Sequence, residues 1–187
     1  MGVRLILASG SPRRRELLGK MGYRFETCSP DVDEHVSGHA RDIVTTLAER
    51  KAKAGAEHYQ DGILIASDTL VSLDGAPLGK PADAADACRM LRALSGREHE
   101  VFSGVCVMDV ATGRHITRAV RTGVTFREMT DEEIDAYIAT GEPMDKAGAY
   151  AIQGGASRFV SSLDGELENV IGFPVVEVGE MLKDFGL

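Results

Sequence analysis

At 187 residues the chain is long enough to bury one good hydrophobic core, as one domain or as two lobes. Its composition, 43% hydrophobic and 27% charged, is that of an ordinary soluble globular protein. A net charge of −8, with 5% aromatic residues and no tryptophan, argues against general nucleic-acid binding, so a polyanionic ligand must be held by local basic residues.

The cysteines, Cys28, Cys88 and Cys106, are widely spaced and odd in number. They form no C-x-x-C pair, and we interpret them as free thiols of a reducing cytoplasm. The apolar run at residues 3–8 is too short for a signal peptide or a membrane span. The sequence therefore predicts a cytoplasmic protein with no membrane segment, and we treat residues 1–187 as a single domain.

The first predicted strand runs into the first predicted helix through a Ser-Gly-Ser turn at residues 9–11. Ser11 is suited to cap the helix, and Pro12 at its first position gives up no needed N–H. Arginines at residues 13–15 then fill the first turn, where the helix dipole is already positive. Each such cation is unfavourable by roughly 0.3–1 kcal/mol.

A bound anion resolves this conflict, because free amides together with guanidinium groups form a seat for phosphate oxygens. The alternative is a solvated basic helix start. The wrong sign of charge at a capped N-terminus favours phosphate, with two or three of these arginines as ligands.

The next segments bring a lysine and several acidic residues into consideration. Residues 23–28 alternate like a second strand, an acidic loop containing Glu34 follows, and residues 42–57 form a helix. At 100° per residue, Lys51 falls inside the apolar stripe of that helix and Lys53 on the opposite face. Lys51 either extends its stem along apolar surface toward solvent or reaches into a ligand site.

The apolar run at residues 63–73 predicts a central strand with Asp68 in its middle. An unpaired buried carboxylate is costly, so Asp68 should meet a metal, a cation or several hydrogen-bond donors. The alternative is a structural Asp68 bonded to a neighbouring loop. The basic groups already found favour a functional site.

The remaining predicted helices, strands and loops follow along the chain, and turn-forming residues mark most of their ends. They are Leu78-Gly79-Lys80-Pro81 as a loop, a helix from Asp83 to Ser95-Gly96, strands at 101–108 and 116–126, a helix opened by the capping box at 130–133, a Gly/Ala-rich loop at 141–155 leading into a short strand, a strand at 159–163, and a closing helix from Pro174. Lys80 on its own reads as an ordinary loop lysine.

Taken together, these motifs resemble the Maf family of nucleoside triphosphate pyrophosphatases. The resembling segments are Ala8–Arg14, Leu47-Ala48 with Lys51-Ala52, Ala66–Thr69, Gly79–Pro81, Met90-Leu91 to Ser95-Gly96 with His99, Gly141–Pro143, Asp145–Tyr150, Gln153-Gly154 and Asn169–Pro174. They cover nearly the whole chain in order. Segment 145–154 looks like the branch acting on dTTP and UTP rather than the branch acting on 7-methyl-GTP. In two places the chain departs from the family: Ser103 stands for the usual Thr, and Glu166-Leu167 for the usual Ser-Tyr.

The resemblance implies an α/β fold, similar also to inosine triphosphatases: a long, bent mixed sheet flanked by helices, with two lobes and a deep cleft. It implies a homodimer and hydrolysis of a nucleoside triphosphate to the monophosphate and pyrophosphate, with a divalent metal, Mg²⁺ or Mn²⁺, as cofactor. Asp68 is the expected metal ligand or water-activating base, and Glu34 the second metal-ligand candidate.

The expected site residues divide by role. Asp68, Lys51 and Lys80 are expected to be catalytic, and Ser9, Ser11, Arg13, Arg14, Thr69 and Gln153 to bind substrate. The resemblance places Arg13, Thr69 and Gln153 among the positions that set substrate choice. Gln153 carries both a donor and an acceptor for a pyrimidine edge, although a loop glutamine bonded to backbone is the alternative.

Other functions remain open at this point. A non-catalytic, nucleotide-binding regulator of cell division would not need Asp68 in an apolar strand. A nucleotidyltransferase or phosphomonoesterase would share the basic helix start, but the sequence has no H-x-x-x-D, C-x₅-R or Walker motif.

Overall fold

The computed structural model describes residues 3–187, and the chain divides into two compact units. Unit 1 contains residues 3–69, 103–120 and 172–187, and unit 2 contains residues 70–102 and 121–171. The strands form a seven-stranded sheet with the order β2-β1-β3-β5-β6-β7, in which β4 also pairs with β3. The α/β class with a mixed sheet is therefore confirmed, whereas the deep cleft and the dimer stay predictions.

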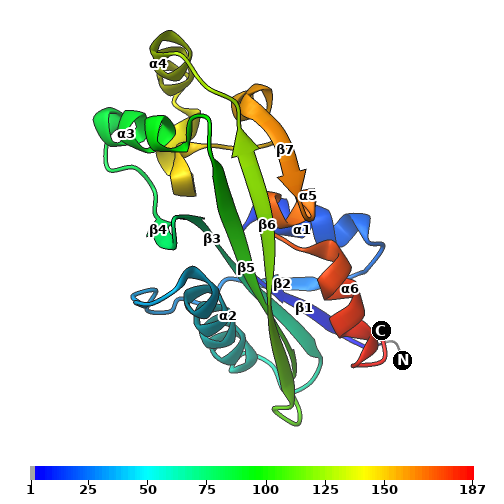
Figure 1. Cartoon of the computed structure of the whole chain (residues 1–187). Helices are drawn as coiled ribbons and strands as arrows, with labels where there is room; N and C mark the ends of the chain where they lie inside the picture. The colour runs from blue at the N-terminus through cyan, green and yellow to red at the C-terminus, as the bar shows by residue number, and fades with distance from the viewer. Residues whose placement is uncertain (1–2) are drawn as a thin grey trace. The chain divides into compact units, whose positions relative to one another are not determined.

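Unit 1 holds the first strands and three helices of the chain (Figure 1). Its elements are β1 (Leu5–Ala8), α1 (Pro12–Lys20), β2 (Glu26–Cys28), α2 (Ala40–Ala56), α6 (Val175–Lys183), the beginning of β3 (Ile63–Leu73), the end of β5 (Glu98–Asp109) and the beginning of β6 (His115–Phe126). β1 pairs in parallel with both β2 and β3, and Ala8 is opposite Ala66.

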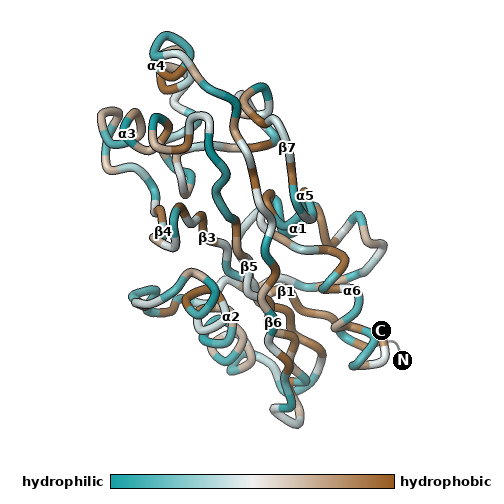
Figure 2. Tube along the Cα trace, viewed as in Figure 1, coloured by the Kyte–Doolittle hydropathy of each residue, from teal (hydrophilic) through white to brown (hydrophobic). Residues whose placement is uncertain are grey.

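Both faces of the parallel strands in unit 1 are covered, which explains why their sequences are continuously apolar. Ile6, Leu64 and Cys106 pack with Ala48 and Ala52 of α2. Figure 1 shows α6 on the side of β1 away from α2, and Figure 2 shows β1 and its neighbours as mainly hydrophobic while α2 alternates between the two colours. The position of each lysine in the amphipathic pattern of α2 thus decides whether it faces the sheet or solvent.

Helix α2 approaches β5 very closely at Gly104. A Cβ atom at this position would lie 2.2 Å from the carbonyl oxygen of Val44, far inside van der Waals contact. Backbone atoms cannot yield as a flexible side chain can. Only glycine therefore allows α2 to rest on the strand at this distance.

Unit 2 holds the middle of the chain, and its elements surround a second hydrophobic core. They are the end of β3, β4 (Ala76–Leu78), α3 (Ala84–Leu94), the beginning of β5, the end of β6, α4 (Asp131–Ala139), the 3₁₀ helices η1 (Glu142–Asp145), η2 (Ala147–Ala149) and η3 (Gly155–Phe159), β7 (Val160–Asp164) and α5 (Leu167–Ile171). β4 is antiparallel to β3, and β7 is antiparallel to β6.

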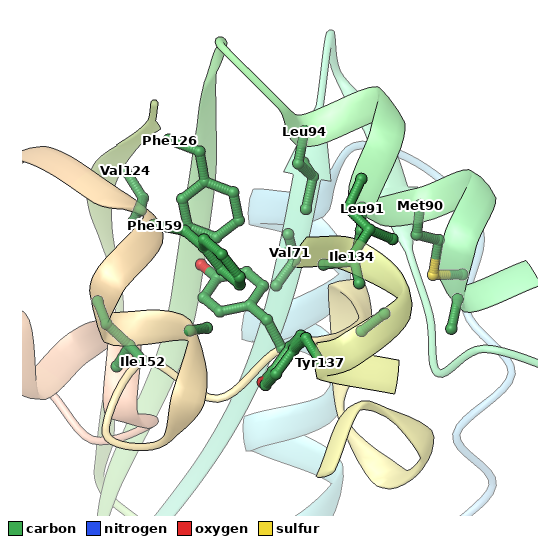
Figure 3. Packing of buried hydrophobic residues seen from close by; sticks show 14 of the residues in the cluster. Val71, Met90, Leu91, Leu94, Val124, Phe126, Ile134, Tyr137, Ile152 and Phe159 are labelled. Carbon is green, nitrogen blue, oxygen red and sulfur yellow. The ribbon is translucent and has the colours of Figure 1, made fainter. Parts of the chain in front are cut away.

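Aromatic rings dominate the core of unit 2 (Figure 3). Tyr137 meets Phe159 edge to face with ring centroids 5.6 Å apart, and Phe126 meets Tyr150 in the same way at 4.9 Å. His99 also packs edge to face on Phe126 at 4.9 Å. Such pairs fix ring orientation beyond what area burial alone would do.

Several predicted boundaries need correction. The strand expected at 23–28 is paired only over Glu26–Cys28, because β1 offers it partners from Ile6 to Ala8 alone. The strand expected near residue 150 is wrong, since the segment forms η1, η2 and a turn. Gly148 (φ +71°) and Ala149 (φ +62°) adopt left-handed backbone conformations that no strand accommodates.

The strongest local signals are confirmed. Ser11 caps α1, Asp83 caps α3, and Thr130 forms the capping box of α4 with Glu133. Within residues 3–187, no helix is both long enough and apolar enough to cross a bilayer.

Candidate active site

The turn between β1 and α1 has the geometry expected of an anion seat. The backbone N–H of Ser11 donates to Ser9 Oγ at 3.1 Å, and Ser11 Oγ accepts the Arg14 N–H at 3.5 Å. The first turn of α1 contains no acidic residue. The amides of Ser11 and Arg14 are therefore bonded within the turn, and positive side chains follow in the first turn of the helix.

The three arginines of α1 differ in exposure and in bonding. Arg13 and Arg15 are exposed, whereas Arg14 is half-buried. Arg14 donates from Nε to the carbonyl oxygen of Gly172 at 2.9 Å, from Nη1 to Ser9 Oγ at 3.4 Å and from Nη2 to Thr69 Oγ1 at 3.2 Å.

Burial acts on the charge of Arg14. It lowers the pKa of the guanidinium, while the Asp68 carboxylate raises it and Arg13 lowers it further. The hydrogen-bond partners of Arg14 are neutral oxygens, while the Asp68 and Glu34 carboxylates act on it electrostatically. A phosphate group would add a direct charge-assisted hydrogen bond.

Helix α2 and strand β3 bring Lys51 and Asp68 together. Lys51 Nζ lies 2.6 Å from Asp68 Oδ1 and 2.8 Å from Glu34 Oε1. The Lys51 side chain is 14% exposed and that of Asp68 is 15% exposed, whereas Lys53 is 62% exposed. The helical phase predicted from the sequence is confirmed, and Asp68 has the cation that its position requires.

Strand topology explains why Asp68 and Thr69 are available to a ligand. β1 stops at Ala8, opposite Ala66, while β3 continues beyond that point. Asp68 and Thr69 therefore follow the carboxyl end of the parallel pair, where open α/β sheets bind ligands. Because neighbouring strand residues point to opposite faces, one reaches Lys51 and the other reaches Arg14.

The acidic pair Asp68 and Glu34 is the place where a divalent metal would fit. Both carboxylates reach one ammonium within 2.8 Å, so their oxygens converge on a single point. In the described residues no three His, Cys, Asp or Glu side chains cluster for a metal. Mg²⁺ commonly takes only one or two protein carboxylates and completes its shell with water and substrate oxygens, so the two carboxylates fit such an ion.

Lys80 and Gln153, the other two predicted site residues, belong to unit 2. Lys80 follows β4 in an exposed loop, and Gln153 is exposed in the turn between η2 and η3. Among residues 3–187 neither side chain has a hydrogen-bond or ion-pair partner within the protein. In the described residues the Gln153 side chain thus bonds no backbone group, and its role in base recognition stays a prediction.

The turn that carries Gln153 is held on both sides by the buried Tyr137 and the half-buried Glu142. Tyr137 donates its hydroxyl to Glu142 and accepts the N–H of Ala151 at 3.0 Å, and Glu142 accepts the N–H of Gly155 at 3.0 Å. A Cβ atom at Gly154 would lie 2.0 Å from Glu142 Oε1. The backbone around Gln153 is thus held, although its side chain is exposed.

Sequence reasoning missed the residues that support the site. Ser103 and Gly172 bond the groups around Arg14, while Tyr137 and Glu142 hold the Gln153 turn. Glu142 and Gly172 lie in segments that resemble the Maf family, which was the one available signal. Their partners lie up to 158 positions away along the chain, so no local pattern could assign their roles.

Comparison with known proteins places residues 4–185 in the family described as Maf-like protein. Curated relatives named dTTP/UTP pyrophosphatase come from Geobacter sulfurreducens, 49% identical over 98% of this chain and 97% of the relative, and from Dictyoglomus turgidum, 46% identical over 97% and 96%. A third, from Anaeromyxobacter dehalogenans, is 48% identical over 100% and 96%.

Proposed function

The chain belongs to the Maf family, and from this premise we propose that it is a nucleoside triphosphate pyrophosphatase that hydrolyses dTTP and UTP to the monophosphate and pyrophosphate. One observation carries the proposal: in unit 1, the Lys51–Asp68 pair and the half-buried Arg14 lie around the start of α1. The names of the full-length relatives support the choice of pyrimidine nucleotides.

The reaction is attack of water on the α-phosphorus, with pyrophosphate as the leaving group. Negative charge grows on the leaving oxygens, and fixed cations that face them lower the barrier. We assign this task to Arg13 and Arg14 at the start of α1 and to Lys51, with Ser9 and Ser11 lining the same turn. Lys80 is assigned to the triphosphate on the strength of the resemblance and of its exposed ammonium.

Asp68 accepts the proton of the attacking water or holds the metal. Its carboxylate already bonds Lys51, which fixes its orientation before substrate arrives. Glu34, from the loop before α2, is the second acidic ligand that we assign. Bound Mg²⁺ or Mn²⁺ supplies charge stabilisation to the phosphates and lowers the pKa of nearby water.

Gln153 is assigned to the base. A pyrimidine such as uracil presents carbonyl acceptors on either side of an N–H donor, and one amide offers both complements. The exposed amide of Gln153 on a clamped turn is suited to that task. A 7-methyl-GTP specificity is the competing assignment, and the names of the relatives favour the pyrimidines.

We extend the proposal to the assembly and the compartment. A homodimer is proposed on the family resemblance. A cytoplasmic location is proposed because Cys28, Cys88 and Cys106 form no disulfide.

Product analysis over a panel of triphosphates tests the function. Purified protein with Mg²⁺ or Mn²⁺ is incubated with UTP, dTTP, CTP, ATP, GTP and 7-methyl-GTP, and monophosphate, diphosphate, phosphate and pyrophosphate are separated. We expect UMP or dTMP together with pyrophosphate, and slower turnover of the purines. Diphosphate with phosphate would refute attack at the α-phosphorus, and binding without any product would support a non-catalytic regulator.

A further inference from the structure

The turn that carries Gln153 rests on the hydrophobic core of unit 2. Ile152, the residue before Gln153, is 9% exposed and belongs to that core. Tyr137 of α4 is buried in the same core, and its ring centroid lies 5.6 Å from that of Phe159 (Figure 3). Gln153 itself is exposed. The turn is therefore anchored on one side and presents a polar side chain on the other.

The hydroxyl of Tyr137 and the carboxylate of Glu142, which we call the clamp, bond the turn at two points. Tyr137 accepts the N–H of Ala151 at 3.0 Å and donates its own proton to Glu142 Oε2. The same carboxylate oxygen accepts the N–H of Gly155 at 3.0 Å. The clamp thus holds the backbone two residues before and two residues after Gln153.

The chemistry of the two groups fits this arrangement. Burial raises the pKa of Tyr137, and its hydrogen bond to Glu142 raises it further, so the hydroxyl keeps the proton that it donates. A carboxylate only accepts, and one of its oxygens can serve two donors. A Cβ atom at Gly154 would lie 2.0 Å from Glu142 Oε1, so the carboxylate lies directly against the backbone of the turn.

We infer that Glu142 is a positioning residue for base selection: with Tyr137 it fixes the backbone on both sides of Gln153, so that the amide of Gln153 meets a pyrimidine edge in one orientation. This inference rests on the proposed function, which assigns Gln153 to the base. Binding orders a mobile side chain at a cost, and a backbone that is already fixed limits this cost to the side chain itself.

Loss of the clamp should change the choice of base. Glu142→Ala leaves the Tyr137 proton and the Gly155 N–H without their acceptor, and Tyr137→Phe removes the bond to Ala151 but keeps the ring. We expect the ratio of kcat/KM for UTP to that for GTP to fall roughly 10- to 50-fold in Glu142→Ala and about tenfold in Tyr137→Phe. Glu142→Gln retains an oxygen that can accept both donors, so its ratio should stay within about threefold of the unaltered protein.

Two matched controls separate this role from a purely structural one. Tyr150→Phe removes another buried hydroxyl of the same core, one that bonds His99 at 2.7 Å. Glu132→Ala removes an exposed carboxylate from α4, the helix that carries Tyr137. Both controls should leave the UTP-to-GTP ratio unchanged. Denaturant unfolding of every variant measures its loss of stability separately from its loss of selectivity.

A double-mutant cycle measures whether Glu142 acts through Gln153. In the Gln153→Ala background, Glu142→Ala should change the UTP-to-GTP ratio by less than about twofold, because no amide remains to be oriented. The Kd of inorganic tripolyphosphate, measured by calorimetry, should be the same for Glu142→Ala and the unaltered protein, because this probe has no base.

Three results would overturn the inference. They are a UTP-to-GTP ratio in Glu142→Ala within about twofold of the unaltered protein, effects of Glu142→Ala and Gln153→Ala that simply add, or a loss as large in Glu142→Gln as in Glu142→Ala. Failure of the proposed function looks different, because then no triphosphate yields pyrophosphate. In that case the Kd values of UMP and GMP, measured by calorimetry in the same variants, test the inference through the same ratio. Equal Kd values in the unaltered protein would overturn it.

Discussion

The proposed phosphate site of unit 1 and the Gln153 turn of unit 2 are held together in different ways. In unit 1 the side chains proposed to be functional bond one another: Lys51 bonds Asp68, and Arg14 bonds Thr69. In unit 2 the functional side chain is exposed and only its backbone is held, by Tyr137 and Glu142.

The contrast follows from what each region is proposed to bind. Charge development on phosphate requires groups whose positions are set before reaction, since reorganising them would cost part of the stabilisation. A base edge requires an amide with unfilled bonding capacity, which a side chain inside a network lacks. Substitutions in the first region should therefore change rate, and those in the second should change choice of base.

The largest effect is expected from Asp68→Asn, which keeps the size of the side chain but removes its charge. Turnover should fall by about 10²–10⁴ if Asp68 is the base, while substrate binding weakens much less. Measured kcat and Kd for UTP test this. Asp61→Asn is the matched control, because Asp61 is 72% exposed and, among residues 3–187, pairs with Arg4 alone. A kcat within a few fold of the unaltered protein would make Asp68 structural.

An acid-dependent loss of stability should come from unit 2, where His99 is buried and bonds the Tyr150 hydroxyl at 2.7 Å. Burial lowers the pKa of His99 to about 4. Between about pH 6.5 and pH 4 the unfolded chain then binds a proton that the folded one does not, so stability falls as pH falls. The full loss is at most about 3 kcal/mol.

Denaturant unfolding from pH 7 to pH 4.5 measures this loss, with His99→Gln as the comparison. The variant has no titrating ring, so its stability should fall less steeply over this interval. Equal slopes would show that His99 carries no such linkage. Activity per folded molecule should not follow the same curve, since His99 lies outside the phosphate site.

Lys51→Ala and Lys53→Ala form a natural pair on α2. Removing Lys51 leaves Asp68 and Glu34 without their shared cation, so kcat/KM for triphosphates should fall by roughly tenfold or more. Lys53 is 62% exposed and lies 3.9 Å from Glu49, so its removal should be nearly silent. Similar effects from both would contradict the assignment of Lys51 to the site.

Gln153→Ala should change selectivity more than rate. An unpaired base edge costs roughly 1–3 kcal/mol in kcat/KM, and this loss should appear for UTP and dTTP but not for GTP. The ratio of kcat/KM for UTP to kcat/KM for GTP should therefore decrease. A constant ratio of UTP to GTP would remove Gln153 from base recognition and leave the phosphate chemistry untouched.

The smallest effect is expected from a substitution that disturbs the backbone of the Gln153 turn and leaves the Gln153 amide in place. Gly154→Ala places a Cβ atom 2.0 Å from Glu142 Oε1, so the Glu142 side chain must move while Gln153 stays present. We expect a loss of selectivity for UTP of about tenfold or less, with a modest loss of stability. Gly19→Ala, at a position with open space around it, is the control. Unchanged selectivity would mean that the clamp does not position the amide.

The sequence predicted interactions between residues close along the chain better than interactions between distant residues. The cap at Ser11 and the inward phase of Lys51 depend on neighbours within a few positions, and both are confirmed. Lys51 and Asp68 were expected near the same ligand, but their direct contact joins a helix and a strand 17 positions apart. The helical period predicts the direction in which a side chain points, but not the residue that it contacts.

Contacts between residues far apart along the chain could not be predicted from local sequence patterns. The bonds from Thr69 to Ser103 and Gly172 span 34 and 103 positions, so they depend on how strands and termini assemble. The segment near residue 150 misled for another reason: its Gly/Ala composition fits a strand or a turn equally well. The left-handed backbone at Ala149, which excludes a strand, has no signature in the residue type.

Gly104 brings the backbone of α2 against that of β5, and α2 carries Lys51 of the proposed site. A Cβ atom at Gly104 would lie 2.2 Å from the Val44 carbonyl oxygen, so no side chain fits between α2 and β5 at this point. Any opening there must lift backbone from backbone and admit water to both. Amide hydrogens of α2 and β5 should therefore exchange as one cooperative unit, and each such opening would carry Lys51 away from Asp68. The time for which Lys51 and Asp68 stay in contact would then depend on the close packing at Gly104.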